Sequence, residues 1–319
     1  MSIKRMLNIV STDGVALGLW EIVPDVPSKR PPILLLHGAT ISSVLFDVPL
    51  EGYSLMRYLA REGRCVYALD IRGYGASAAH PVMDAMPDAA PPFARAADAV
   101  KDIEAAIATI RRLHDGAAVD LVGFSWGSLA AARYASRRYA DVRRLVLYAP
   151  LYAESNALWR ARIGDPADST LLDRRFGAYR LVSKNDLMMR WHQDLGTDPM
   201  PKRDEAIVDA LFAALAEADP QALARTPPAF RCPNGAFADL IEVFNGCPLY
   251  DPAQIQSPVL LVRGEADTTS TATDAGRLFA SLGSHEKHYL QLAPGSHFLC
   301  IENNRVSLYR AIAHFLGEG

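Results

Sequence analysis

The stretch "VDLVGFSWGSLAAARYA", residues 119–135, changes character at its central serine. An apolar run typical of a buried strand precedes Ser125, and an alanine-rich run typical of a helix follows it. Gly123 and Gly127 lie two residues to either side. A sharp strand-to-helix turn puts its central residue in a strained left-handed conformation and requires neighbours without side chains. The pattern therefore predicts a Ser125 hydroxyl exposed at a strand end, beside a helix N-terminus whose dipole and free amides favour negative charge.

Similar apolar runs recur along the chain and alternate with helical patterns. The opening segment 7–23 is typical of a hairpin that turns at Asp13-Gly14. Near-continuous apolar runs then occupy 32–38, 65–73, 119–125, 143–150, 258–267 and 287–297, and helical patterns occupy 51–62, 94–113, 126–139, 271–282 and 303–316. Apolar runs without alternation are typical of parallel strands covered on both faces. The order predicts an α/β sheet, mostly parallel and flanked by helices, with antiparallel strands at one edge.

This alternation stops between residues 151 and 250, where the sequence is polar, aromatic and helix-like without a clear buried strand. A length of 319 residues fits one core with a large insertion. We therefore expect a core formed by 1–150 and 251–319, and a helical cap formed by 151–250. The aromatic residues of the cap are expected to pack in its own core or to line an apolar pocket; they include Trp159, Phe176, Trp191, Phe212, Phe237 and Phe244.

A serine hydroxyl has a high pKa and needs a general base within hydrogen-bond reach to become nucleophilic. In "LAPGSHFLC", His297 directly follows the last expected strand, in a turn made by Pro294 and Gly295. Active groups of α/β sheets gather at the carboxyl ends of strands. His285 and His288 precede or start that strand. His297 is therefore the predicted base.

The base needs an acid to hold its tautomer and to stabilise the imidazolium. Asp267 follows another expected strand, in "PVLLVRGEADTTS", and is the predicted acid. Glu265 and the more distant Glu154 compete with it for this role. Asp267 also has an alternative, purely structural role as the N-cap of the helix that begins near Thr271.

A tetrahedral intermediate needs two preorganised N–H donors for its oxyanion. The amide of Trp126, directly after the serine, is one candidate. The second is expected in "LLLHGATISSVLF", most naturally at the amide of Ala39, with neighbouring Thr40 as the alternative. Gly38 allows this loop to approach, and His37 is expected to brace it as a buried residue.

The motifs "HGAT", "DIRGYGAS", "GFSWGS", "GEAD" and "GSHF", taken in this order, resemble those of the α/β-hydrolase superfamily across 1–150 and 251–319. The resemblance implies the α/β-hydrolase fold, with Ser125 as nucleophile, His297 as base, Asp267 as acid, and Ala39 and Trp126 as oxyanion donors. It gives Asp70 and Arg72 structural roles. A serine at the turn departs from the aspartate of dehalogenases and epoxide hydrolases, and "HGAT" departs from the H-G-G-G of lipases similar to hormone-sensitive lipase.

These observations predict a serine hydrolase that cleaves a carboxylic ester, lactone or related acyl compound through an acyl-enzyme. Its substrate is expected to be a small apolar acyl molecule, and no metal or organic cofactor is expected. The same triad also fits C–C bond cleavage in a diketone or acyl transfer to an acceptor other than water. A ligand-binding homologue without turnover is the third hypothesis.

Composition narrows the partners. The chain has 33 basic and 36 acidic residues, with a formal net charge of −3 and basic clusters no larger than Arg pairs, so no nucleic-acid partner is expected. No apolar run approaches the roughly 20 residues that span a bilayer. The apolar stretch in "MSIKRMLNIVSTDG" is too short for a signal peptide, which predicts a cytoplasmic protein without a membrane partner.

The four scattered cysteines predict free thiols, Cys232–Cys247 being the only local pair. A homodimer is compatible with these features.

Overall fold

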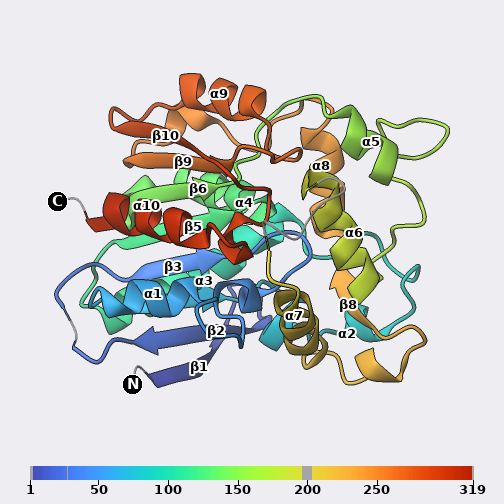
Figure 1. Cartoon of the computed structure of the whole chain (residues 1–319), viewed down its shortest axis with the longest axis horizontal. Coiled ribbons are helices and arrows are strands. Elements are labelled where there is room, and N and C mark those ends of the chain that lie inside the picture. The colour runs from blue at the N-terminus through green and yellow to red at the C-terminus, as the bar shows by residue number, and fades with distance from the viewer. Residues whose placement is uncertain (1–2, 27, 196–202, 318–319) are drawn as a thin grey trace.

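An eight-stranded sheet forms the centre of the molecule in a computed structural model, which describes residues 3–26, 28–195 and 203–317. The strand order is β1-β2-β4-β3-β5-β6-β9-β10 (Figure 1). The strands are β1 (Ile3–Val10), β2 (Ala16–Val23), β3 (Ile33–Leu36), β4 (Val66–Leu69), β5 (Val119–Phe124), β6 (Val142–Tyr148), β9 (Val259–Gly264) and β10 (Lys287–Leu292). β1 and β2 pair antiparallel as a hairpin, β2 pairs antiparallel with β4, and the other neighbours are parallel. The predicted α/β sheet is confirmed.

The central strands are buried over their whole length, as their apolar runs predict. Every residue of β3, β4, β5 and β9 is buried. In the parallel register, Leu36 at the end of β3 pairs with Gly123 near the end of β5. The carboxyl ends of these strands therefore lie side by side, and the loops that follow them meet at one edge of the sheet.

Helices cover both faces of the sheet. The core helices are α1 (Leu55–Arg61), α2 (Pro81–Asp84), α3 (Ala96–Leu113), α4 (Trp126–Ala135), α9 (Ala272–Ser281) and α10 (Arg305–Gly317). α1 contacts α10, and both lie in front of the sheet in Figure 1, whereas α3 contacts α4. Side-chain caps fix where α1 and α9 begin, because the hydroxyls of Ser54 and Thr271 accept hydrogen bonds from the amides of Arg57 and Asp274.

The segment 151–250 is inserted between β6 and β9. It contains α5 (Ala157–Ile163), β7 (Tyr179–Ser183), α6 (Lys184–Leu195), α7 (Ala206–Ala216), β8 (Ala229–Pro233) and α8 (Gly235–Val243). In Figure 1 its helices lie to the right of the sheet, and the two termini lie to the left. The expectation of a segment without strands is wrong, because β7 and β8 pair as an antiparallel two-stranded sheet. Each strand has only five residues and carries an arginine, which hides the apolar signal.

The Pro- and Ala-rich loop 79–93 packs against the inserted segment. The amide of Ala178 donates to the carbonyl of Pro87 at 2.6 Å, and the amide of Phe93 donates to the carbonyl of Ala178 at 3.2 Å. The hydroxyl of Tyr179 donates to the carbonyl of Ala85 at 2.8 Å. These contacts tie a long loop of the core to the start of β7.

The structure also shows the state of the cysteines and the character of the helices. All four cysteines are free thiols, as predicted: Cys232 is buried and Cys247 is exposed. Of the helices in the described part of the chain, none has the length and apolar character to cross a membrane.

Candidate active site

The turn between β5 and α4 holds Ser125 in a strained conformation. Its φ is 54° and its ψ is −122°, in agreement with the glycine spacing around it. A Cβ at Gly127 would lie 2.3 Å from the carbonyl oxygen of His37, and one at Gly123 would lie 2.4 Å from the carbonyl oxygen of Gly127. Both glycines are therefore required for β5 to turn this tightly beneath the loop after β3.

The structure brings Ser125, His297 and Asp267 together from three different strand ends. Oγ of Ser125 lies 2.9 Å from Nε2 of His297. Nδ1 of the same imidazole lies 2.8 Å from Oδ2 of Asp267. All three residues are buried, with exposed fractions of 5% or less. The imidazole therefore bridges the hydroxyl and the carboxylate.

Asp267 is held as a carboxylate. Its Oδ1 accepts hydrogen bonds from the amides of Thr269 at 2.8 Å and Ser270 at 2.9 Å. Burial alone raises the pKa of this carboxyl, but the charge and hydrogen bond of His297, together with the amide of Ser270, hold the pKa below its ordinary value. The competing acids lie elsewhere, since Glu265 is exposed and Glu154 accepts a hydrogen bond from Thr271.

The amides of Ala39 and Trp126 donate no hydrogen bond to any acceptor among residues 3–26, 28–195 and 203–317. Gly38 lies under the first of them, where a Cβ would be 3.3 Å from Cβ of Ser125. The carbonyl of Ala39 accepts from the hydroxyl of Tyr74 at 2.9 Å, which holds the loop in place. Both amides are therefore without an acceptor among the described residues.

His37 braces this loop, as expected. Its Nδ1–H donates to the carbonyl of Gly38 at 2.8 Å, and its Nε2 accepts from the amide of Ile71 at 3.1 Å. Burial lowers the pKa of the imidazole, which favours the neutral form that these two bonds require. Asp70 also has a structural contact, accepting from the amide of Ser43 at 2.9 Å.

Arg72 is structural as well. It is nearly buried and pairs with Asp102 at 2.6 Å and with Asp13 at 2.7 Å. Asp13 belongs to the turn of the β1–β2 hairpin and Asp102 to α3. The arginine therefore joins the edge of the sheet to a helix and does not contact the triad.

Three buried carboxylates, which the sequence analysis did not predict, accept hydrogen bonds from groups at or next to Ser125 and His297. Asp194, at the end of α6, accepts from the amide of His297 at 3.0 Å. Glu302 accepts from the amide of Ser296 at 3.0 Å and from the indole of Trp191 at 2.8 Å. Asp239 accepts from the indole of Trp126 at 2.8 Å. Two of these acids come from the inserted segment, where no motif marks them.

A cavity of about 310 Å³ opens over Ser125 and His297. Of the six aromatic residues singled out in the inserted segment, three line this cavity: Trp159, Phe176 and Phe237. The other three do not line it and pack in the hydrophobic core: Trp191, Phe212 and Phe244. The loop after β3 and the inserted segment thus enclose the serine between them.

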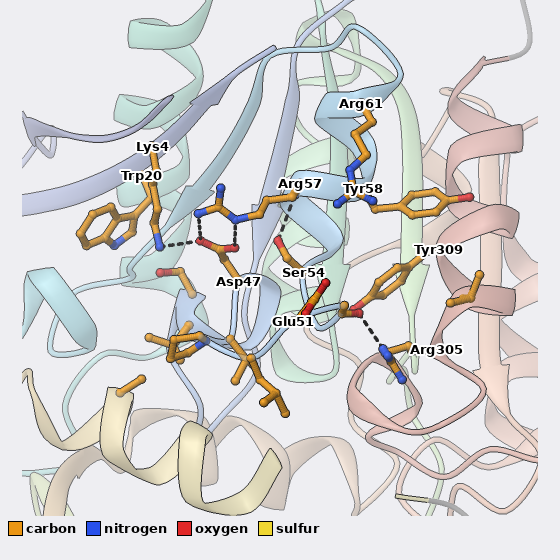
Figure 2. A pocket seen from close by; sticks show the side chains of 18 of the residues that line it. Lys4, Trp20, Asp47, Glu51, Ser54, Arg57, Tyr58, Arg61, Arg305 and Tyr309 are labelled. Atoms are coloured by element: carbon orange, nitrogen blue, oxygen red, sulfur yellow. Dashed lines mark hydrogen bonds and ion pairs between the residues drawn. The ribbon is translucent and has the colours of Figure 1, made fainter. Parts of the chain in front are cut away.

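A larger cavity, of about 740 Å³, lies away from the triad, between α1, α7 and the start of α10 (Figure 2). Its carboxylate Asp47 is paired with Lys4 at 2.8 Å and with Arg57 at 2.9 Å. Arg305 lies 3.6 Å from the ring centroid of Tyr53 and donates to the carbonyl of Gly52 at 2.7 Å. Among the described residues that line this cavity, no side chain is paired with a base as a nucleophile would be.

Within the described residues, no group of three or more His, Cys, Asp or Glu side chains is arranged to hold a metal ion. His297 and Asp267 are engaged with each other and with Ser125.

Comparison with known proteins identifies the fold. The model of the α/β-hydrolase fold family matches residues 31–304. No curated protein matches the sequence. Among solved structures, a monoacylglycerol lipase from Paleococcus ferrophilus is 21% identical with a TM-score of 0.59, over 94% of this chain and 98% of that one. An esterase from Exiguobacterium antarcticum is 15% identical with a TM-score of 0.62, over 98% and 99%. E-2-(acetamidomethylene)succinate hydrolase is 21% identical with a TM-score of 0.62, over the whole of both chains.

Proposed function

Since the chain is a hydrolase that belongs to the α/β-hydrolase family, we propose that it cleaves a carboxylic ester, lactone or related acyl compound through Ser125. One observation carries this proposal: a single imidazole lies 2.9 Å from the serine hydroxyl and 2.8 Å from a buried carboxylate. Hydroxyl, base and orienting acid in hydrogen-bond sequence form the arrangement that nucleophilic acyl transfer requires.

In the first half of the reaction, Oγ of Ser125 attacks the carbonyl carbon while Nε2 of His297 accepts its proton. The charge that develops on the carbonyl oxygen is stabilised by the amides of Ala39 and Trp126. Asp267 stabilises the imidazolium through Nδ1–H. His297 then gives its proton to the leaving alcohol, and the acyl group stays on Ser125.

In the second half, His297 accepts a proton from water, and the hydroxide attacks the acyl-enzyme. The same two amides stabilise the second oxyanion, and the proton returns to Oγ of Ser125 as the acid product leaves. Segment 151–250 acts as the cap of this site, because it supplies most of the cavity wall that faces the triad.

The activities of the structural neighbours agree with this class of reaction. Two of the three named above are a lipase and an esterase, and the third is a hydrolase of an amide-bearing succinate. At identities of 15–21% they support the general chemistry and leave the substrate to the pocket of this chain.

Turnover of p-nitrophenyl esters of increasing acyl length tests the proposal, with wild type, Ser125→Ala and Ser128→Ala measured in parallel. Ser128 lies one turn along α4, and its hydroxyl accepts from the amide of Leu151 at 3.3 Å, so it is a matched serine outside the triad. We expect Ser125→Ala to lose on the order of 10⁴–10⁶-fold in kcat. Ser128→Ala is expected to keep most of it. Equal loss in both variants would contradict the assignment of the nucleophile.

A further inference from the structure

The cavity over Ser125 has an unusual set of charges. Four arginines line it, namely Arg162, Arg175, Arg180 and Arg190, against one acid, Asp186. The apolar pocket expected from the aromatic residues therefore has a strongly positive component. A positive charge in a half-buried cavity is costly unless it has a partner of opposite charge. The contacts of each arginine show which of these charges have no such partner in the described part of the chain.

Arg180, from β7, lies against the loop that carries Ala39. Its Nη2 donates to the hydroxyl of Thr40 at 2.8 Å, and its Nη1 donates to the carbonyl of Pro233 at 3.0 Å. Its guanidinium lies 3.9 Å from the ring centroid of Phe237. All these partners are neutral, and no carboxylate of residues 3–26, 28–195 or 203–317 forms an ion pair with it. Arg180 is thus fixed in position with its charge uncompensated.

Arg162, from α5, is in the same state. Nη1 donates to the side-chain oxygen of Gln193 at 2.6 Å, and the guanidinium lies 5.3 Å from the ring centroid of Trp159. No ion pair to it is found within the described part of the chain. Burial, with the charges of Arg190 and Arg180, lowers the pKa of Arg162 to about 10, so it remains charged at neutral pH. The three cations share one electrostatic environment.

Arg190, from α6, contacts residues that neighbour Asp267 and His297 in the sequence. Nη2 donates to the hydroxyl of Thr269, two residues after Asp267, and the guanidinium is 5.4 Å from the ring centroid of Phe298. Nη1 lies 3.6 Å from Asp194 but forms no hydrogen bond among the described residues. Arg190 therefore has a partial partner and an unused donor.

The remaining two charged residues do not cancel this excess. Arg175 is mostly exposed and pairs with Asp173 at 3.2 Å. Asp186 is exposed, and its Oδ2 accepts from the amide of Ser183 at 2.8 Å and from the hydroxyl of Ser183 at 2.7 Å, at the start of α6. The cavity therefore keeps the positive charges of Arg162 and Arg180.

We propose that this cavity selects an ester substrate that carries an ionised carboxylate in addition to its ester group. Arg180 and Arg162 bind this carboxylate while Ser125 attacks the ester carbonyl. The proposal rests on the hydrolase function above and names its substrate class. Guanidinium groups present planar pairs of donors that match a carboxylate, and they stay charged when desolvated. The aromatic walls accommodate the apolar part of the acyl group.

The test compares ionised and neutral substrates of similar length. On the acyl side, p-nitrophenyl hydrogen adipate is compared with p-nitrophenyl heptanoate. On the leaving-group side, 4-acetoxybenzoate is compared with 4-acetoxybenzamide. We expect kcat/KM to be about ten-fold or more higher for the ionised member of at least one pair, as a charged hydrogen bond would give. A ratio at or below one in both pairs overturns the proposal.

Three variants locate the effect. Arg180→Gln and Arg162→Gln are each expected to reduce the preference for the ionised substrate, mainly through KM, with a smaller effect on its neutral partner. Arg160→Gln is the matched control, because Arg160 lies on the same helix α5, carries the same charge and does not line the cavity. A preference that falls equally in Arg160→Gln would reflect general charge attraction and would contradict binding by Arg162 and Arg180.

Binding without turnover separates this proposal from the hydrolase function. The Ser125→Ala protein keeps all the arginines, so adipate is expected to raise its Tm, and neutral adipamide is not. Stabilisation by adipate without any ester turnover in wild type would contradict the proposed function and support the anion site. Equal turnover of charged and neutral esters, without stabilisation by adipate, would overturn the anion site and leave the hydrolase intact.

Discussion

Asp267 combines complete burial with a retained charge. Its carboxylate accepts from two backbone amides and contacts the imidazole of His297 at 2.8 Å. Burial opposes ionisation, but these contacts outweigh it and hold the pKa of the carboxyl below its ordinary value. A carboxylate in this state stabilises the folded protein at pH values above about 4, the pKa of an aspartate in the unfolded chain. This contribution is lost as the pH falls below that value.

This direction of pH dependence gives a prediction for Asp267→Asn, because an asparagine side chain cannot ionise at this position. The free energy of unfolding of wild type minus that of the variant is expected to shrink as the pH falls from 6 to 3, because only wild type must protonate its carboxylate. Urea unfolding at several pH values measures the difference. Glu265→Gln, which removes an exposed neighbouring carboxylate without touching His297, is the control. A difference that grows on acidification would contradict the ionised state of Asp267.

The meeting of Ser125, His297 and Asp267 could be predicted because each directly follows a strand run, and strand ends of a parallel sheet converge. Asp194 could not be predicted in the same way. It lies at the end of α6 in the inserted segment, and its contact with the amide of His297 joins residues 103 positions apart. No local periodicity encodes such a contact. The arginines of the cavity were also missed, since isolated arginines in a polar, helix-like segment are usually solvated.

At the scale of elements, the turn from β5 into α4 depends on the close approach of the loop after β3. Gly127 lies in the first turn of α4, where its missing side chain leaves room for the backbone of His37. The same approach brings the amide of Ala39 towards Ser125. Strand, helix and loop are thus mutually dependent at one small contact.

Gly127→Ala is expected to destabilise the protein by about 1–3 kcal/mol and to reduce turnover strongly, because its Cβ would collide with the backbone of His37. Gly276→Ala provides the matched control inside α9, where a Cβ would meet no atom within 4 Å. That change is expected to stabilise the protein by about 0.5–1 kcal/mol, since alanine favours a helix over glycine. Thermal unfolding of both variants checks the pair. Equal effects of the two substitutions would argue against the close contact.

Sequence patterns located most core elements because long apolar runs and helical periods are local properties. The strands β7 and β8 escaped for a physical reason. Arg180 and Arg231 interrupt their apolar character, and the two strands stabilise each other across about 50 residues, with Leu181 paired to Arg231. Short strands of this kind depend on pairing and burial more than on their own sequence.

For the molecule as a whole, the inserted segment is bound to the core at the site itself. Trp126, next to Ser125, donates through its indole to Asp239 of α8 at 2.8 Å, and Trp191 of α6 donates to Glu302 at 2.8 Å. Asp239 also pairs with Arg95 at 2.8 Å. Buried polar groups with these partners fix one arrangement of the two parts. The cavity and the strand ends that carry Ser125, Asp267 and His297 are therefore positioned together.

The central claim is that Ser125 is the nucleophile. The most direct test is the intact mass of wild type and Ser125→Ala after treatment with a fluorophosphonate, which reacts covalently with an activated serine. The account predicts one adduct on wild type and none on the variant, with both proteins folded by circular dichroism. An unmodified wild type, or an adduct that persists in Ser125→Ala, would contradict it.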